Sequence, residues 1–219
     1  MRDTIIYNQL CKNLGNIPTD DQSAALKKIA SYICDNNNDV IFLMTGYAGT
    51  GKTSVISSIV KTLDLLRMRS VLLAPTGRAA KVLASYSGRP AFTIHKKIYR
   101  QKSSKDGFGS FSLDRNLHKD TFFIVDEASM VSNNSGDASL FGSGRLLDDL
   151  IEFVYSGTDC KLIIVGDTAQ LPPIGSIVSP ALDEDALGAY GFGLISCELK
   201  QVVRQSETSG VLMNATRVR

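Results

Sequence analysis

Several residue types are scarce in this sequence of 219 residues, which contains no tryptophan, two histidines and four cysteines. The cysteines are widely separated and form no Cys-x-x-Cys pair, so neither a disulfide framework nor a zinc site is expected. No apolar run approaches the roughly eighteen residues of a membrane-spanning helix. The amino-terminal segment MRDTIIYNQLCKN interrupts its apolar residues with Asn, Gln and Lys, unlike a signal peptide. These absences predict a cytoplasmic protein with no membrane partner.

Charge is balanced over the whole chain but not along it. The formal net charge is only +2, yet the segment from Leu65 to Lys105 contains no Asp or Glu. Its ten basic residues are Arg67, Arg69, Arg78, Lys81, Arg89, Lys96, Lys97, Arg100, Lys102 and Lys105. A solvated basic face would have this composition, but such charge segregation also suits contact with a polyanion.

The chain alternates between helical and strand patterns. Thr19 is suited to cap a helix whose first turn carries Asp20 and Asp21. Apolar runs of strand length follow at Val40 to Thr45, Ser70 to Ala74, Thr121 to Val125 and Lys161 to Val165, with a weaker one at Gly193 to Leu199. Strands separated by helices predict an α/β fold, a doubly wound parallel sheet with helices on both faces.

Two segments interrupt this alternation. Residues 101–120 contain Gly107, Gly109 and a Phe108/Phe111 pair, which predict a small inserted hairpin or loop. Residues 132–144, SNNSGDASLFGSG, are poor in core residues and predict a mobile surface loop.

Gly46 to Thr53 read GYAGTGKT, the phosphate-binding loop pattern, after an apolar strand and at the start of a helix. Backbone N–H groups and the helix dipole attract phosphate, Lys52 reaches the terminal phosphates, and Thr53 offers a hydroxyl to Mg²⁺. The motif therefore predicts ATP and Mg²⁺ as cofactors. The expected nucleotide-binding residues are Gly49, Thr50, Gly51, Lys52, Thr53 and Ser54.

Two further strand ends carry candidate catalytic residues. In FFIVDEASM, from Phe122 to Met130, Asp126 is suited to the Mg²⁺ shell and Glu127 to activating a water, which predicts hydrolysis. A solvated acidic pair is the alternative. In VGDTAQLPPIG, Gln170 would lie beside the nucleotide and contact its γ-phosphate or the attacking water. The alternative is a Pro-stiffened loop with a solvated glutamine, which would have the same sequence pattern.

These motifs, taken in order, resemble the first motor domain of superfamily 1 DNA helicases. The resemblance rests on GYAGTGKT, LAPTGRAAKVL, TIHK, VDEASM, GDTAQLPPIG and LKQVVRQ, and covers Ile17 to Gln205. The motifs are most similar to the RecD-like branch, which includes the Pif and Dda enzymes and tracks single strands from 5′ to 3′. The resemblance implies a RecA-like P-loop NTPase fold that binds single-stranded DNA.

The resemblance also implies roles that the residues alone would not reveal. Gln22 falls where the family places an adenine-reading glutamine, and Arg204 matches an arginine that contacts the γ-phosphate. The single-strand path would be lined by Pro75, Thr76, Arg78, Thr93, His95 and Lys96.

The family pattern continues into a second motor domain. This sequence ends at Arg219, shortly after Arg204, so residues 1–219 are expected to be the first motor domain, with the second absent from the chain. Two other interpretations are an AAA-type ATPase and a nucleotide-gated nucleic-acid-binding module with little turnover. AAA-type ATPases usually carry a sensor asparagine where this chain has GDTAQLPP, and that difference favours the helicase.

Overall fold

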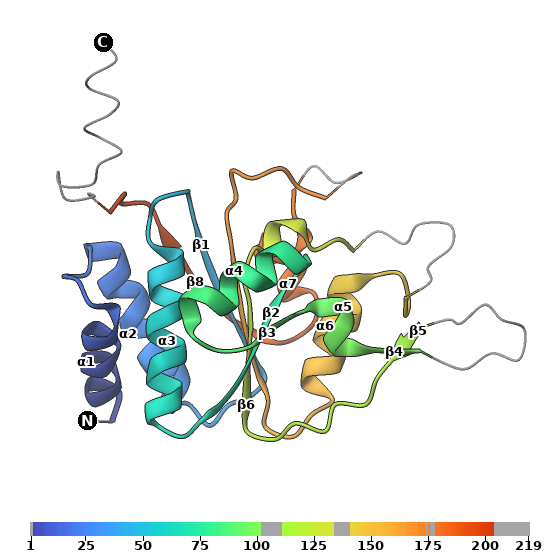
Figure 1. Ribbon diagram of the computed structural model, residues 1–219, viewed down its shortest axis with the longest axis horizontal. Helices are drawn as coiled ribbons and strands as arrows, with labels where there is room; N and C mark the ends of the chain where they lie inside the picture. Colours follow the sequence, from blue (N-terminus) through green and yellow to red (C-terminus); the bar gives the residue numbers. More distant parts are fainter. Residues whose placement is uncertain (1, 102–110, 134–140, 174, 176–177, 204–219) are drawn as a thin grey trace, which may run out of the picture.

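The computed structural model describes residues 2–101, 111–133, 141–173, 175 and 178–203. In this part of the chain six parallel strands form one sheet in the order β3-β2-β6-β7-β1-β8 (Figure 1). The strands are β1 (Val40–Gly46), β2 (Arg69–Ala74), β3 (Ala91–Thr93), β6 (Thr121–Val125), β7 (Lys161–Gly166) and β8 (Gly193–Leu199). The predicted α/β fold is confirmed. Strand β3 was not predicted, because its three partly exposed residues are too few to show a strand pattern.

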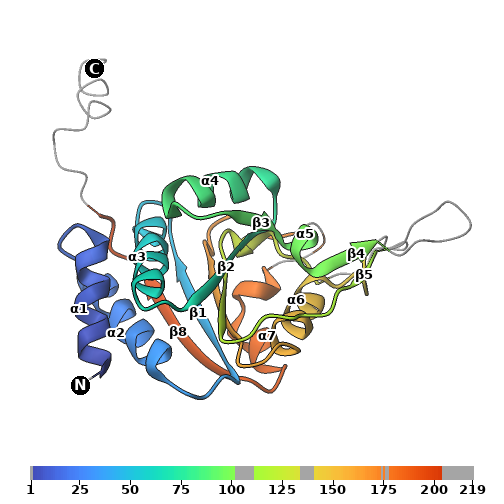
Figure 2. The same ribbon diagram turned by 60° about the horizontal axis from the view of Figure 1, so that its bottom comes forward.

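Helices cover both faces of the sheet, as predicted (Figure 2). One face is covered by α2 (Asp20–Cys34), α3 (Lys52–Leu65) and α4 (Gly77–Ser87), and α1 (Arg2–Leu14) packs on α2 and α3. The other face carries α5 (Ile94–Ile98), η1 (Ala128–Met130), α6 (Leu146–Tyr155), η2 (Pro180–Leu182) and α7 (Glu184–Gly188). Within the described residues, none of these helices combines the length and apolarity needed to span a bilayer.

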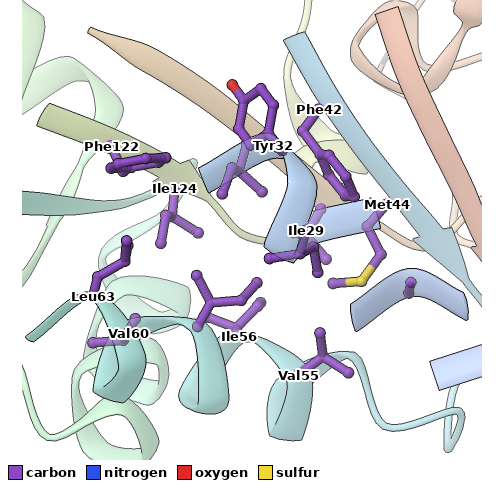
Figure 3. Close-up of a cluster of buried hydrophobic side chains, with 14 of the residues drawn as sticks. Ile29, Tyr32, Phe42, Met44, Val55, Ile56, Val60, Leu63, Phe122 and Ile124 are labelled. Carbon is purple, nitrogen blue, oxygen red and sulfur yellow. The ribbon is translucent and has the colours of Figure 1, made fainter. Parts of the chain in front are cut away.

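The core on the first face holds α3 against the sheet (Figure 3). Ile56 and Leu63 of α3 are fully buried with Phe42 of β1. Burying a side chain of this size contributes about 1.5–3 kcal/mol. The buried hydroxyl of Tyr32 donates to the carbonyls of Val40 and Leu162, at 2.9 and 3.0 Å. The strand before the phosphate loop and the helix after it are therefore both firmly packed.

Helix α2 begins as the sequence predicts. The Thr19 hydroxyl accepts the backbone N–H of Gln22 at 3.3 Å, and the Gln22 side chain accepts the backbone N–H of Thr19 at 3.1 Å. This capping box satisfies two helix-end donors reciprocally. Helix α1 was not predicted, although its buried residues Ile6, Leu10 and Leu14 recur at a helical spacing of four.

The predicted hairpin is a small antiparallel pair of β4 (Tyr99–Gln101) and β5 (Phe111–Leu113). It begins two residues earlier than the predicted range 101–120 and ends at Leu113. The first residue of each hairpin strand contacts a residue distant in sequence: the Tyr99 hydroxyl donates to Asp149 at 2.6 Å, and the Phe111 ring stacks on Phe141. These contacts hold the two strand ends in place. Residues 102–110, and residues 134–140 of the predicted loop 132–144, lie outside the described part of the chain.

Candidate functional site

The predicted nucleotide site is a cavity of about 460 Å³ at the carboxyl edge of the sheet. The loops after parallel strands meet at this edge, where open α/β sheets bind ligands. The predicted residues that line the cavity are Gly49, Gly51, Lys52, Thr53, Ser54, Glu127 and Gln170. The lining residues that the sequence analysis did not single out are Tyr47, Ala48, Asp167, Val202 and Val203.

The phosphate loop requires its glycines. Gly49 and Gly51 have φ angles of 81° and 88°, in the left-handed region that glycine adopts without strain. Thr50 is buried, and its hydroxyl donates to the carbonyl of Tyr47 at 2.8 Å. Gly51 is the N-cap of α3, and no side chain among the described residues caps this end of the helix. A helix start of this kind favours an anion at its backbone N–H groups.

Gln22 contacts the phosphate loop directly. Its side chain is only 3% exposed, and its amide nitrogen donates to the carbonyl of Thr50 at 3.0 Å. A Cβ atom on Gly51 would lie 2.3 Å from this nitrogen, so the two residues are closely fitted. The amide nitrogen has a second N–H and the amide oxygen a second lone pair, and these are the groups that an adenine base would use. The adenine role remains a prediction.

Lys52 lies at the centre of the site. Its ammonium group donates to the carbonyls of Gly46 and Tyr47, at 2.6 and 2.9 Å, and lies 3.5 Å from a carboxylate oxygen of Asp167. Asp167 is buried and directly follows β7. Like Asp126 after β6, Asp167 is an acid directly after an apolar strand, and this pattern could have predicted it.

Asp126 is held by two donors. One carboxylate oxygen accepts the backbone N–H of Glu127 at 2.9 Å, and the other accepts the hydroxyl of Tyr86. Burial raises the pKa of Asp126 above its ordinary value, although both hydrogen bonds act in the opposite direction. Burial and the neighbouring carboxylate raise the pKa of Tyr86, so that the phenol keeps its proton and acts as the donor.

The donor set suits Mg²⁺. Among the described residues there is no group of three or more His, Cys, Asp or Glu side chains that would hold a metal alone. Mg²⁺ usually takes one or two carboxylates together with substrate phosphates and water. One carboxylate from Asp126 and one hydroxyl from Thr53 fit that pattern, and the predicted assignment of these ligands stands as a proposal.

Glu127, Gln170 and Ser129 form a chain of hydrogen bonds. The amide nitrogen of Gln170 donates to Glu127 at 3.0 Å, and the hydroxyl of Ser129 donates to the amide oxygen of Gln170 at 2.8 Å. Glu127 has a φ angle of 56°, which for a residue other than glycine costs about 1–3 kcal/mol. The fold therefore places two predicted catalytic residues in contact. Ser129 is 1% exposed, and its part was not predicted.

The predicted single-strand residues gather at the ends of β2 and β3. Ala74 pairs with Thr93 across these neighbouring strands, so the segments after them begin side by side. Thr76 caps α4 and Thr93 caps α5, each accepting a backbone N–H at 3.2 Å. Pro75 is partly exposed, whereas Arg78 and Lys96 are exposed on this surface.

His95 has a different environment from its neighbours. Its ring lies 5.1 Å from the ring of Phe141 and 5.7 Å from that of Tyr99, measured between ring centres. Burial lowers the pKa of His95, which favours the neutral imidazole. His95 is therefore packed among aromatic rings, and its predicted contact with a single strand stays a prediction.

The segment after β8 returns to the phosphate loop. The backbone N–H groups of Lys200 and Gln201 donate to Asp21 of α2, at 2.9 and 2.8 Å, and that of Val203 donates to the carbonyl of Gly49 at 3.0 Å. These backbone donors, that of Gln201 first, lower the pKa of Asp21. Arg204 lies outside the described residues, and its predicted γ-phosphate contact stays a prediction.

Fold and site together define a class of protein. A parallel sheet with a phosphate-binding loop after β1 and adjacent acids after β6 is the arrangement of P-loop nucleoside triphosphatases. Residues 18–217 match a family model described as an AAA domain, and the chain belongs to this family.

Among P-loop nucleoside triphosphatases, the chain is similar to several DNA helicases. The chain is 28% identical over 200 residues to the ATP-dependent RecD2 DNA helicase of Deinococcus radiodurans, covering 90% of this chain and 23% of that protein. It is 28% identical over 201 residues to the ATP-dependent DNA helicase dda of Enterobacteria phage T4, covering 86% and 40%. The Pif1 helicase from Candida albicans matches 92% of this chain and 44% of its own, with a TM-score of 0.54 and 24% identity. The resemblance to superfamily 1 helicases of the RecD-like branch is confirmed, and the chain spans less than half of each of these proteins.

Proposed function

We propose that this chain is a helicase motor domain that binds Mg²⁺-ATP and single-stranded DNA. In the complete enzyme it would couple ATP hydrolysis to 5′ to 3′ translocation and duplex unwinding. The observation that carries the proposal is the meeting of Lys52, Glu127 and Gln170 around one cavity, beside a phosphate loop in its characteristic backbone form.

We propose one role for each of these side chains. Lys52 would exchange its loop carbonyls for the β- and γ-phosphates of ATP. Asp126 and Thr53 would hold Mg²⁺, which when bound neutralises charge on the phosphates. Glu127 would accept a proton from the attacking water, and Gln170 would keep that carboxylate in place. From the resemblance, Gln22 would read adenine and Arg204 would contact the γ-phosphate.

Single-stranded DNA would bind across the starts of α4 and α5. The first turn of α4 offers a positive dipole end, and Arg78 and Lys96 add charge without an acidic residue nearby in sequence. Such contacts read the phosphate backbone rather than base identity. The resemblance also implies a second motor domain as the partner that closes the nucleotide cavity.

The decisive test is ATP turnover with and without single-stranded DNA. Because a second motor domain would close the nucleotide cavity, we expect the 219-residue chain alone to release phosphate slowly at most. Any release should increase when a short oligo(dT) is added and should be absent in Lys52→Ala. A rate of ATP turnover that is the same with and without the oligonucleotide would favour an AAA-type ATPase. Tight binding of both ligands with no turnover would favour a nucleotide-gated binding module.

A further inference from the structure

Helix α4 links the two proposed binding surfaces. It begins at the Thr76 cap, beside the proposed single-strand contacts, and its last turn carries Tyr86. Eleven helical residues span about 16 Å. The Tyr86 hydroxyl donates to a carboxylate oxygen of Asp126, the proposed magnesium ligand. Helix α4 thus starts at the proposed DNA surface and ends at a side chain that is bonded to the proposed magnesium ligand.

Tyr86 is fixed from both sides. Its backbone carbonyl accepts the hydroxyl of Ser57, on α3, at 3.2 Å. Its ring is partly buried against the core that packs α3 on the sheet. Tyr86 and Thr53 also line the same cavity, of about 190 Å³. Tyr86 therefore bonds to one proposed magnesium ligand and lines a cavity together with the other.

The bond from Tyr86 completes the hydrogen bonding of Asp126. Among the described residues, the backbone N–H of Glu127 donates to one carboxylate oxygen of Asp126, and the Tyr86 hydroxyl is the hydrogen-bond donor to the other. Tyr86 therefore sets the direction of this second oxygen. Side chains that orient a metal ligand commonly change metal affinity or activity by about 10–100-fold when they are removed.

We propose that Tyr86 is a positioning residue for the magnesium site. We also propose that α4 couples single-strand binding to the orientation of Asp126 through the Tyr86 hydroxyl. The inference rests on the proposed function, because it requires both Mg²⁺-nucleotide and DNA. A shift of α4 on DNA would move the Tyr86 hydroxyl and so alter how Asp126 is presented to Mg²⁺. By reciprocity, Mg²⁺ binding would change the affinity for DNA by the same factor.

The test is Tyr86→Phe, which removes one hydroxyl and keeps the ring. Binding of a fluorescent ATP analogue is measured against Mg²⁺ concentration, with and without oligo(dT). We expect the half-saturating Mg²⁺ concentration to rise about tenfold or more in the variant. Binding of the analogue in EDTA should be unchanged, and the variant should remain folded, although the loss of a hydrogen bond to a carboxylate should lower its melting temperature by a few degrees. In the wild type oligo(dT) should shift the half-saturating Mg²⁺ concentration, and in Tyr86→Phe this shift should be lost.

The matched control is Tyr190→Phe, which removes another hydroxyl bonded to a carboxylate, that of Asp148. It should behave as the wild type. If Tyr86→Phe has the same Mg²⁺ dependence as the wild type, the positioning role is wrong. If oligo(dT) shifts the half-saturating Mg²⁺ concentration equally in the wild type and in Tyr86→Phe, the link through α4 is wrong. If the wild type shows no Mg²⁺-dependent nucleotide binding, the proposed function itself fails, and the inference with it.

Discussion

Lys52 is paired with Asp167 across two strand ends, so a change at this residue tests both the phosphate loop and its surroundings. We expect Lys52→Ala to weaken Mg²⁺-ATP binding about ten- to hundredfold, since a hydrogen bond to a charged group contributes about 1.5–3 kcal/mol. Titration with a fluorescent ATP analogue measures this loss. Lys12→Ala, which removes an exposed lysine from α1, is the control. Unchanged affinity in Lys52→Ala would contradict the nucleotide site.

Glu127 and Asp126 are neighbours with separable roles. We expect Glu127→Gln to bind Mg²⁺-ATP normally but to slow hydrolysis by about 10²–10⁴-fold, the usual contribution of a general base. Asp126→Ala should instead weaken the magnesium-dependent part of binding. Single-turnover hydrolysis and nucleotide titration separate the two effects. Glu152→Gln, at an exposed position of α6, should leave both measurements unchanged.

His95 makes the stability of the fold depend on pH. Because burial depresses its pKa in the folded protein, folding favours the neutral ring. The unfolded chain takes up the proton near pH 6.5, so stability is present above that pH and is lost as pH falls toward the folded pKa. In urea unfolding, the free energy of unfolding should differ less between pH 8 and pH 5 for His95→Gln than for the wild type. An equal difference would show that His95 does not contribute.

The residues of the site were predictable to the extent that each follows a recognisable strand. Asp126 and Glu127 come directly after an apolar run, and Lys52 and Gln170 follow other apolar runs by a few residues. The fold brings these segments to one edge of the sheet. Tyr86 lies 40 residues from Asp126 in sequence, and only the packing of α4 on the sheet brings them together. Partners of this kind leave no local pattern in a single sequence.

The elements α4 and α5 set the geometry of the proposed single-strand surface. We expect oligo(dT) affinity to fall steeply with salt, with a logarithmic slope of about −0.7 per phosphate contact. Replacing Arg78, Lys96 and Lys97 with alanine should reduce the size of that slope by about two. A triple variant of Lys12, Lys27 and Lys61 has the same charge change elsewhere and should keep the slope. Equal slopes in both variants would show that the basic segment is only a solvated face.

Element boundaries were less predictable than element types. The strands before the phosphate loop and before Asp126 are buried along their length, and a continuous apolar run identifies them. Strand β3 and the hairpin strands have only three residues each, and their limits depend on contacts such as that of Tyr99 with Asp149. Short elements are defined by tertiary packing, which a single sequence does not display.

At the scale of the whole molecule, nucleotide binding should stabilise the fold. A ligand at a hundred times its dissociation constant adds about 2.7 kcal/mol. For a chain of this size, 1 kcal/mol raises the melting temperature by about 2–4 °C, so we expect a shift of roughly 5–10 °C with Mg²⁺-ATP. Differential scanning fluorimetry measures the shift, with Lys52→Ala as the control. No shift in the wild type would contradict binding to the folded chain.

The parallel sheet also leaves one edge of the molecule without a proposed role. Apart from Gln22 of α2, the candidate residues follow carboxyl ends of strands, whereas the opposite edge carries short connections such as residues 35–39 and 156–160. Asn38 and Asp159 join two of these connections through an exposed hydrogen bond of 2.7 Å. A biotin acceptor peptide inserted there would anchor the protein to a glass surface with its ligand-facing edge directed into solution. Single-molecule recordings could then follow one immobilised chain while nucleotide and DNA are exchanged above it.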